Sequence, residues 1–146
     1  MSVEPNVPAP DRSYESIHAG DEACFSRVIG EAEVSGFAAL TGDYNPLHMD
    51  GRYAATTRFG DRVAHGLLVA SYFSTLVGMH LPGKRALFLS QDLSFVQPVH
   101  LGDRITFRGR VRRKTDGSRL LNIDISAIND SREEVIRGRA RVMVLP

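Results

Sequence analysis

Apolar and polar residues alternate with a period of two through much of the C-terminal half of the chain. Because neighbouring side chains of a strand point to opposite faces, this pattern predicts strands with one apolar face. The predicted strands cover residues 86–96, 104–115, 120–128 and 133–145. Asp116-Gly117 and Asn129-Asp130 separate the last three strands and are typical of tight turns, which indicates an antiparallel sheet. The apolar face comprises Leu87, Leu89, Leu93, Phe95, Ile105, Phe107, Val111, Leu121, Ile123, Ile125, Ala127, Ile136, Ala140, Val142 and Val144.

A long helix is predicted immediately before these strands, over residues 63–80. Its length would be roughly 25 Å at the usual rise per residue. Apolar side chains occupy nearly every side of it, so we expect burial on every side. Leu81-Pro82-Gly83 ends the helix. A sheet that is apolar on one face can bury that face by curling around such a helix, which predicts the α+β class.

Shorter elements precede the long helix. The pattern predicts a strand over residues 23–29 and a helix over residues 31–40 that ends at Gly42. A loop rich in Gly, Asp, Asn and Pro follows, and then a short helix over residues 52–56. The polar, proline-containing residues 1–20 predict an extended N-terminal arm, so residues 21–146 form a single domain.

The composition indicates an ordinary globular protein. The formal net charge is +1, so nothing in it favours binding to nucleic acid or to an anionic membrane. The longest apolar run, residues 66–78, is shorter than the ~20 residues that span a bilayer. The N-terminus lacks the basic start and apolar core of a signal peptide. The single cysteine, Cys24, allows no intrachain disulfide and agrees with a reducing cytosol, so we expect a cytoplasmic protein.

The candidate chemistry lies in the segment Phe37-Ala-Ala-Leu-Thr-Gly-Asp43-Tyr-Asn45-Pro46-Leu-His48. A carboxylate and an imidazole on one proline-stiffened turn can share a water, with one group accepting its proton and the other stabilising the charge or returning a proton. Asn45 is a short amide that orients such a loop through the backbone. A purely structural interpretation stays open: a capping Asp, a turn Asn and a surface His.

The same segment resembles the signature of the MaoC-like hydratases, which include the R-specific enoyl-CoA hydratases. Every element of that signature is present, including Ala54 six residues after the histidine. The resemblance continues through residues 58–68 and 81–103 and covers most of the chain from about Ala23 onward. It implies a hot-dog fold, a homodimer, and reversible syn hydration of trans-2-enoyl-CoA to (R)-3-hydroxyacyl-CoA. It also implies that Asp43 and His48 are the catalytic pair.

A third catalytic group is expected at the start of the long helix, Ala64-His65-Gly66. The first N–H groups of a helix have no partner in the helix and lie at its positive end. Gly66 has no side chain, so the oxygen of a thioester enolate can approach its N–H closely. In the MaoC-like family the equivalent glycine N–H is the oxyanion donor. The alternative is that Gly66 only permits close packing, while His65 is interpreted as supporting the loop.

Asn45, Ser74, Lys84 and Arg85 are the predicted substrate-binding residues. By the resemblance, Ser74 lines the acyl or water pocket; the alternative is a small core residue bonded to the preceding helical turn. Lys84 and Arg85 lie near the pantetheine entrance in the family and are candidates for contacts with coenzyme A phosphates. Arg85 departs from the small residue that is frequent there in the family, which leaves the preferred thioester carrier open. The arginines on the polar faces of the strands are interpreted as solvated.

We expect neither a metal nor a separate cofactor. His18, His80 and His100 have no metal-ligand spacing, and the sequence contains no dinucleotide fingerprint or P-loop. Coenzyme A would enter as part of the substrate.

Three other functions are alternatives to an enoyl-CoA hydratase. A 3-hydroxyacyl-acyl carrier protein (ACP) dehydratase would use the same residues. A hot-dog thioesterase usually carries a carboxylate on the central helix, and residues 63–80 contain neither Asp nor Glu. A non-catalytic module that binds acyl thioesters would need neither Asp43 nor His48.

Overall fold

The structure is a computed structural model that describes residues 7–146; residues 1–6 of the predicted arm lie outside the described residues. A short 3-10 helix, η1, precedes the sheet. The elements in chain order are η1 (Tyr14–Ser16), β1 (Glu22–Ile29), α1 (Glu31–Thr41), α2 (Pro46–Met49), α3 (Gly51–Ala55), α4 (Gly66–Met79), β2 (Ala86–Phe95), β3 (Asp103–Thr115), β4 (Leu120–Asn129) and β5 (Glu134–Val144).

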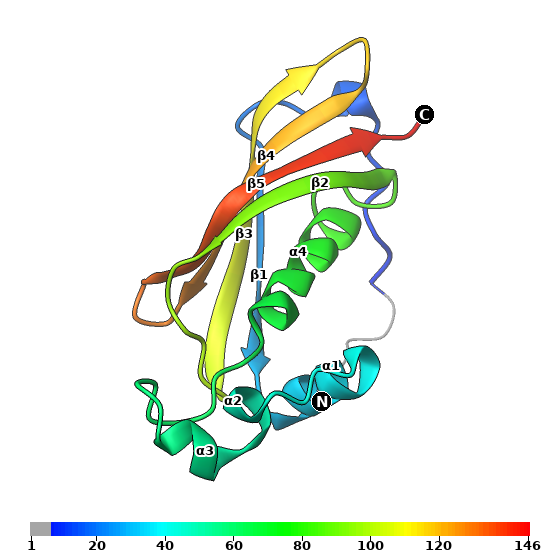
Figure 1. The fold of residues 1–146 in the computed structure, drawn as a ribbon. Coiled ribbons are helices and arrows are strands. Elements are labelled where there is room, and N and C mark those ends of the chain that lie inside the picture. The colour runs from blue at the N-terminus through cyan, green and yellow to red at the C-terminus, as the bar shows by residue number, and fades with distance from the viewer. Residues whose placement is uncertain (1–6) are drawn as a thin grey trace.

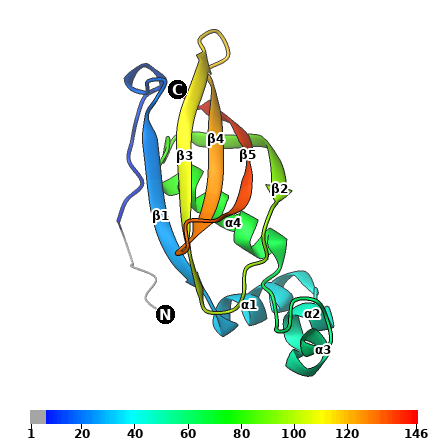
Figure 2. The ribbon, with the colours of Figure 1, turned by 90° about the vertical axis from the view of Figure 1, so that its left-hand side faces the viewer.

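The five strands form one antiparallel sheet in the order β1-β3-β4-β5-β2. The sheet curls around α4, which lies along its concave face (Figures 1 and 2). The three short helices α1 to α3 gather at one end of the sheet, beyond the first turn of α4 (Figure 1). This arrangement confirms the predicted hot-dog architecture.

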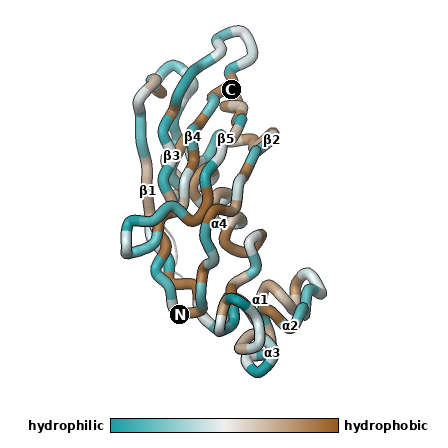
Figure 3. The backbone as a smooth tube through the Cα atoms, turned by 60° about the vertical axis from the view of Figure 1, so that its left-hand side comes forward, coloured by the Kyte–Doolittle hydropathy of each residue, from teal (hydrophilic) through white to brown (hydrophobic). Residues whose placement is uncertain are grey.

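The alternation predicted for β3, β4 and β5 is confirmed. Along these strands the apolar residues are buried and the arginines of the opposite face are exposed. Hydropathy therefore alternates along the strands, while α4 is largely hydrophobic (Figure 3). Ion pairs cover the outer face, where Asp124 lies between Arg112 and Arg139 at 3.6 and 3.4 Å. The strand arginines form a solvated face, as predicted.

The core is centred on the contact between α4 and the middle of the sheet. Phe73 is fully buried and meets the ring of Phe107 edge-on at a centroid distance of 5.6 Å. One turn later, Leu76 fills the space above Gly109, where an added Cβ would lie 3.1 Å from Leu76 Cδ2. Gly109 therefore lets the helix approach the sheet closely.

Two predictions for α4 are wrong: the residue at which it begins, and its burial on every side. The helix begins at Gly66 rather than at residue 63, because the Ala64 N–H donates to the Val99 carbonyl at 2.7 Å and Val63 bridges His100. The sheet also covers only one side of the helix. Leu67 is 64% exposed in the single chain, so α4 is not buried all round.

The face predicted for β2 is also partly wrong. The pairing of β2 with β5 shifts between Phe88 and Ser90, which places Leu89 at a bulge. A bulge adds one residue to a strand and reverses the alternation beyond it. Phe88 therefore packs against the core before the bulge and Leu93 does so after it, whereas Leu87, Leu89 and also Phe95, at the end of the strand, are exposed.

Part of the predicted N-terminal arm packs on the domain. Tyr14 and Ile17 are buried in the core, and the Tyr14 hydroxyl donates to the Asp116 carboxylate at 2.8 Å. The Lys114 ammonium lies 4.1 Å from the centroid of the Tyr14 ring and donates to the Tyr14 carbonyl. The segment is thereby fastened to the hairpin between β3 and β4. Among residues 7–146, no helix is both long and apolar enough to cross a membrane.

Tyr14→Phe should reveal this fastening as a pH-dependent loss of stability. Burial and the Asp116 carboxylate raise the pKa of Tyr14 from 10.0 to about 12. Because the folded state holds the proton more tightly, the contribution of the hydroxyl is complete below pH 10 and is lost as the pH rises towards 12. We expect Tyr14→Phe to lower Tm by ~2–5 °C at neutral pH, a difference that shrinks above pH 10. Thermal denaturation of both proteins across this pH range measures it.

Tyr53→Phe is the matched control, because Tyr53 is 48% exposed and its hydroxyl has no hydrogen-bond partner among the described residues. It should melt like the wild type at every pH. A Tyr14→Phe difference that does not change with pH would contradict the role given to the phenol proton.

Candidate active site

The loop that carries Asp43 starts at the end of α1. Gly42 adopts a left-handed conformation with φ of 81°, and its N–H donates to the Ala38 carbonyl at 2.8 Å, which caps the helix. The chain then turns back through the Asp43 carboxylate, which accepts the N–H of Asn45 at 3.1 Å. The side chain of Asp43 is exposed in the single chain. One of its oxygens is therefore held by the backbone in a fixed orientation.

The segment predicted as a loop contains a further short helix, α2. Asn45 is its N-cap and accepts the N–H of Leu47 at 3.0 Å, and Pro46 occupies the first helical position. Both choices favour a helix start. Asn45 thus has the orienting role expected from its type, and its predicted contact with substrate stays a prediction. As a result, His48 lies on α2, close to the loop that carries Asp43.

The His48 ring has a defined tautomer. Its Nδ1 lies 2.7 Å from the Val63 carbonyl oxygen. A carbonyl oxygen only accepts, so Nδ1 carries the proton. In the neutral ring, Nε2 is therefore left with a free lone pair, the form required to accept a proton from water.

His65 is a buried residue that holds the Asp43 loop in place. It is 2% exposed, precedes the first turn of α4, and donates from Nε2 to the Asp43 carbonyl at 2.9 Å. Its ring lies 4.0 Å from that of His48 and 4.8 Å from that of Phe37, measured between centroids. Its Nδ1 is buried and has no hydrogen-bond partner within residues 7–146. His65 thus links the Asp43 loop to the start of α4, as predicted.

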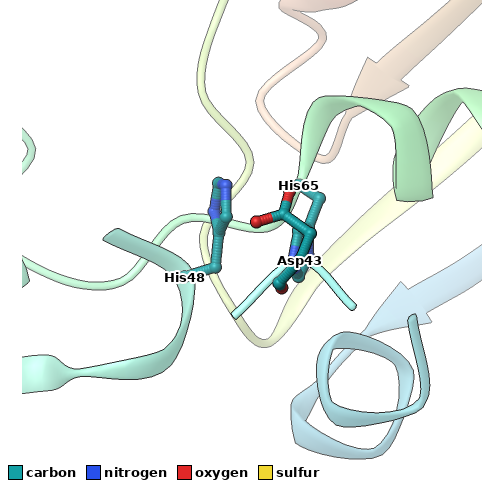
Figure 4. Close-up of side chains that lie close together, drawn as sticks. All are labelled: Asp43, His48 and His65. Atoms are coloured by element: carbon teal, nitrogen blue, oxygen red, sulfur yellow. The ribbon is translucent and has the colours of Figure 1, made fainter. Parts of the chain in front are cut away.

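The Asp43, His48 and His65 side chains converge from the loop, α2 and the start of α4 (Figure 4). One potential ligand atom from each lies within 4.8 Å of the others. A single water can bridge groups at this separation, because two hydrogen bonds reach roughly 5.6 Å. Such a triad could also hold a metal ion, and the predicted absence of a metal stays a prediction.

Arg62 fixes α2 against α1, a role that the sequence did not reveal. Its Nε donates to the His48 carbonyl at 2.5 Å, and its guanidinium pairs with Glu31 at 2.6 Å. This contact lowers the pKa of the Glu31 carboxyl below its usual value. The only hint in the sequence is an arginine next to the helix-starting segment, which does not identify its partners.

A mainly apolar pocket of about 290 Å³ opens beside His48. Its walls come from the loop before α4, the first turns of α4, and the segment after β2. They comprise His48, Arg58, Phe59, Val63, Ala64, Gly66, Val69, Phe95, Val96, Gln97, Pro98, Val99 and Ile136. A Cβ at Gly66 would lie 2.9 Å from Phe95 Cε1, so the glycine lets the Phe95 ring pack closely against the first turn of α4. Most of these residues were not predicted as site residues, because loop contacts bring them together.

Ser74, Lys84 and Arg85 lie away from this pocket in the single chain. Ser74 is exposed on α4, eight residues beyond Gly66. Lys84 and Arg85 follow the C-terminal end of α4 and both pair with Asp11, at 3.3 and 2.6 Å. Their roles as substrate-binding residues stay predictions.

A wider hollow of about 810 Å³ lies on the outer face of the sheet. Its arginines stand beside carboxylates, including the pair of Arg108 and Glu22 at 3.1 Å. None of the predicted catalytic residues lines it. The smaller pocket beside His48 is therefore the candidate active site.

This chain is similar to known proteins in both sequence and fold. A sequence model of the MaoC like domain matches residues 12–131. The (R)-specific enoyl-CoA hydratase of Aeromonas caviae is 50% identical over 94 residues, which are 64% of this chain and 70% of that protein. The 3-hydroxybutyryl-CoA dehydratase of Methylorubrum extorquens is 36% identical over 132 residues, which are 90% of this chain and 83% of that protein.

Among solved structures, an (R)-hydratase from A. caviae involved in PHA biosynthesis superimposes with a TM-score of 0.87 and 39% identity. The match covers 90% of this chain and 99% of the hydratase. The chain therefore belongs to the MaoC-like domain family, and its sheet and central helix have the hot-dog fold of that family.

The two ring orientations predict opposite tautomers for His48 and His65. When both rings are neutral, the proton should lie on Nδ1 of His48 and on Nε2 of His65, because each donates to a carbonyl. Long-range ¹⁵N–¹H correlation spectra at alkaline pH distinguish the two forms. The exposed His18 ring should show a mixture of tautomers. A proton on Nε2 of neutral His48 would contradict the bond to Val63.

Proposed function

We propose that this protein catalyses the reversible syn hydration of a trans-2-enoyl-CoA to the (R)-3-hydroxyacyl-CoA. The observation that carries this proposal is the convergence of Asp43 and His48, within 4.8 Å, beside an apolar pocket that also contains Gly66. Membership of a family that includes (R)-specific enoyl-CoA hydratases supports it.

In the proposed reaction, Asp43 and His48 hold one water between them. A proton of this water passes to the pair, and the hydroxyl adds to C3 of the enoyl group. The pair then returns one proton to C2, so that the elements of one water are added overall. The Val63 carbonyl keeps the His48 ring in place in both protonation states, because Nδ1 carries a proton in each. The reverse sequence removes water from the 3-hydroxyacyl thioester.

Addition at C3 places negative charge on the thioester oxygen, and we assign the Gly66 N–H as its donor. This N–H lies in the first turn of α4, where N–H groups have no partner in the helix. The positive end of the helix dipole favours the same charge. Gly66 lines the pocket, and because it has no side chain it presents its backbone to a thioester bound there.

The composition of α4 disfavours a thioesterase, because Gly66–Met79 contains neither Asp nor Glu. The paired Asp43 and His48 likewise argue against a module that only binds acyl thioesters, which would need neither residue. An ACP substrate would use the same chemistry and is the alternative carrier. We propose that the reaction needs no metal or further cofactor and takes place in the cytoplasm; the lone free thiol, Cys24, is compatible with a reducing compartment.

The catalytic pair is tested with Asp43→Asn, His48→Gln and the double variant. Each single change should lower kcat for crotonyl-CoA hydration by about a hundredfold to ten-thousandfold. Since both residues act on one water, the double variant should be scarcely slower than the slower single variant. Loss of the absorbance of the conjugated thioester without release of free thiol measures hydration. Substrate affinity should change little, because neither side chain is needed to hold the carrier.

Asp130→Asn and His18→Gln are matched controls, because both side chains are exposed and lie outside the pocket. Both should retain wild-type turnover, and a chelator should not affect the wild type. Retention of more than about a tenth of the activity by either pair variant would exclude that residue as the acid or base. Release of free thiol would instead identify a thioesterase, and inactivation by a chelator would indicate a metal.

We also propose that the protein works as a homodimer. The edge strand β2 exposes Leu87, Leu89 and Phe95, and the neighbouring end of α4 exposes Leu67. An exposed strand edge with apolar side chains favours pairing with another chain. A two-fold pairing through β2 would join two sheets into one and cover the exposed side of α4.

Leu89→Arg should therefore convert a dimer into a monomer, because it would place a charged side chain from each subunit in the apolar shared edge. Val28→Arg is the matched control: Val28 is 51% exposed but lies on the opposite edge strand, β1. Light scattering at micromolar concentration gives the mass of each variant. A monomeric wild type, or dissociation by Val28→Arg alone, would contradict an interface at β2.

A further inference from the structure

Among residues 7–146, Arg58 is the single formally charged side chain that lines the pocket beside His48. The remaining walls are apolar or neutral, apart from the titratable His48, and no carboxylate from the described part of the chain lines the pocket. Gly66 and Arg58 both belong to its lining, so a ligand whose thioester reaches Gly66 passes into a space that Arg58 borders. A lone cation in such a setting favours a ligand with an anionic group.

The guanidinium of Arg58 is free to take that group. It is exposed and lies 4.9 Å from the centroid of the Phe59 ring, which steadies it by a cation–π contact. Within residues 7–146, no carboxylate lies within ion-pair distance of it. Arg58 therefore keeps its full capacity to donate hydrogen bonds.

Three other basic side chains, Arg62, Lys84 and Arg85, are already paired with carboxylates. Arg62 is bound to Glu31 and to the His48 carbonyl. Lys84 and Arg85 share the Asp11 carboxylate at the other end of α4. Within one chain, Arg58 is thus the basic side chain best placed to meet an anion on a ligand that occupies the pocket.

We propose that Arg58 binds the phosphate of the phosphopantetheine arm that carries the acyl thioester. This inference rests on the proposed function. Coenzyme A and acyl carrier proteins share this phosphate, so the contact would serve both carriers. A planar guanidinium donates two parallel hydrogen bonds to phosphate oxygens, which suits arginine better than lysine. Arg58 would be a specificity residue that distinguishes phosphorylated carriers from simple thioesters.

The contact should act on KM rather than on kcat. The phosphate is remote from the reacting carbons and does not change charge during hydration, so its contact stabilises ground state and transition state equally. Removing the arginine should therefore raise KM by about tenfold, the range of one hydrogen-bonded charge pair that is partly exposed to water. The effect should also weaken at high ionic strength.

The test compares crotonyl-CoA, crotonyl-phosphopantetheine and crotonyl-pantetheine as substrates of the wild type, Arg58→Ala, Arg58→Lys and Arg113→Ala. Arg113 is the matched control, because it is exposed, lies near the far end of β3, and lines no part of the pocket. Arg58→Ala should raise KM about tenfold for the two phosphorylated substrates and leave kcat unchanged. Its KM for crotonyl-pantetheine should equal that of the wild type. Arg58→Lys should recover part of the loss, and Arg113→Ala should match the wild type throughout.

Three outcomes would overturn the proposal. If Arg58→Ala leaves every KM unchanged while Lys84→Ala/Arg85→Ala raises that of crotonyl-CoA, the phosphate lies at the other end of α4. If Arg58→Ala raises KM equally for all three substrates, Arg58 contacts the acyl or pantetheine part. If Arg58→Ala raises KM for crotonyl-CoA alone, Arg58 contacts the nucleotide. Failure of the wild type to hydrate any of the three substrates would refute the proposed function itself, a result distinct from these.

Discussion

The apolar contact between α4 and the concave face of the sheet positions everything else in this molecule. Phe73 against Phe107, and Leu76 above Gly109, fix the distance and direction of the helix relative to β3. Packed interiors are dense and change shape little, so the N-terminal turn of α4 is held nearly rigidly by this contact. His65 and Gly66 lie at that turn, which places one anchor of the Asp43 loop and one wall of the pocket on a stable element.

Near this turn, two histidines hold the segment that carries Asp43 and His48 through hydrogen bonds to backbone carbonyls. His65 donates to the Asp43 carbonyl, and His48 donates to the Val63 carbonyl, so each ring ties one part of the site to another. These two bonds do not use the groups that we propose to react, which are Nε2 of His48 and the Asp43 carboxylate, one oxygen of which accepts the Asn45 N–H. Arg62 holds α2 against α1 through the His48 carbonyl and Glu31. Local geometry is thus fixed largely by His65, Arg62 and backbone carbonyls, which have no part in the proposed proton transfer.

Charge is distributed differently on the two sides of the sheet. On the outer face, arginines alternate with carboxylates and pair with them, as Arg108 does with Glu22. Exposed pairs of this kind contribute little to stability, but they cancel the local field. At the pocket, by contrast, Arg58 borders mainly apolar walls, to which residues 7–146 contribute no carboxylate. A chain of net charge close to zero can therefore still present one localised positive site to an anionic carrier.

The sequence by itself determined the features that depend on neighbouring residues. The period-two pattern of β3 to β5 and the cap at Gly42 follow from local geometry. The spacing of Asp43 and His48 is likewise local, so the sequence alone predicts that their side chains lie close together. Tertiary structure decided the rest. The bulge at Leu89 reverses a face through pairing with β5, and α4 keeps an exposed side because one sheet covers only half of a helix. The partners of His48 and Arg62 lie 15 and 31 residues away, in Val63 and Glu31, and a contact between distant segments leaves no periodic trace in the chain.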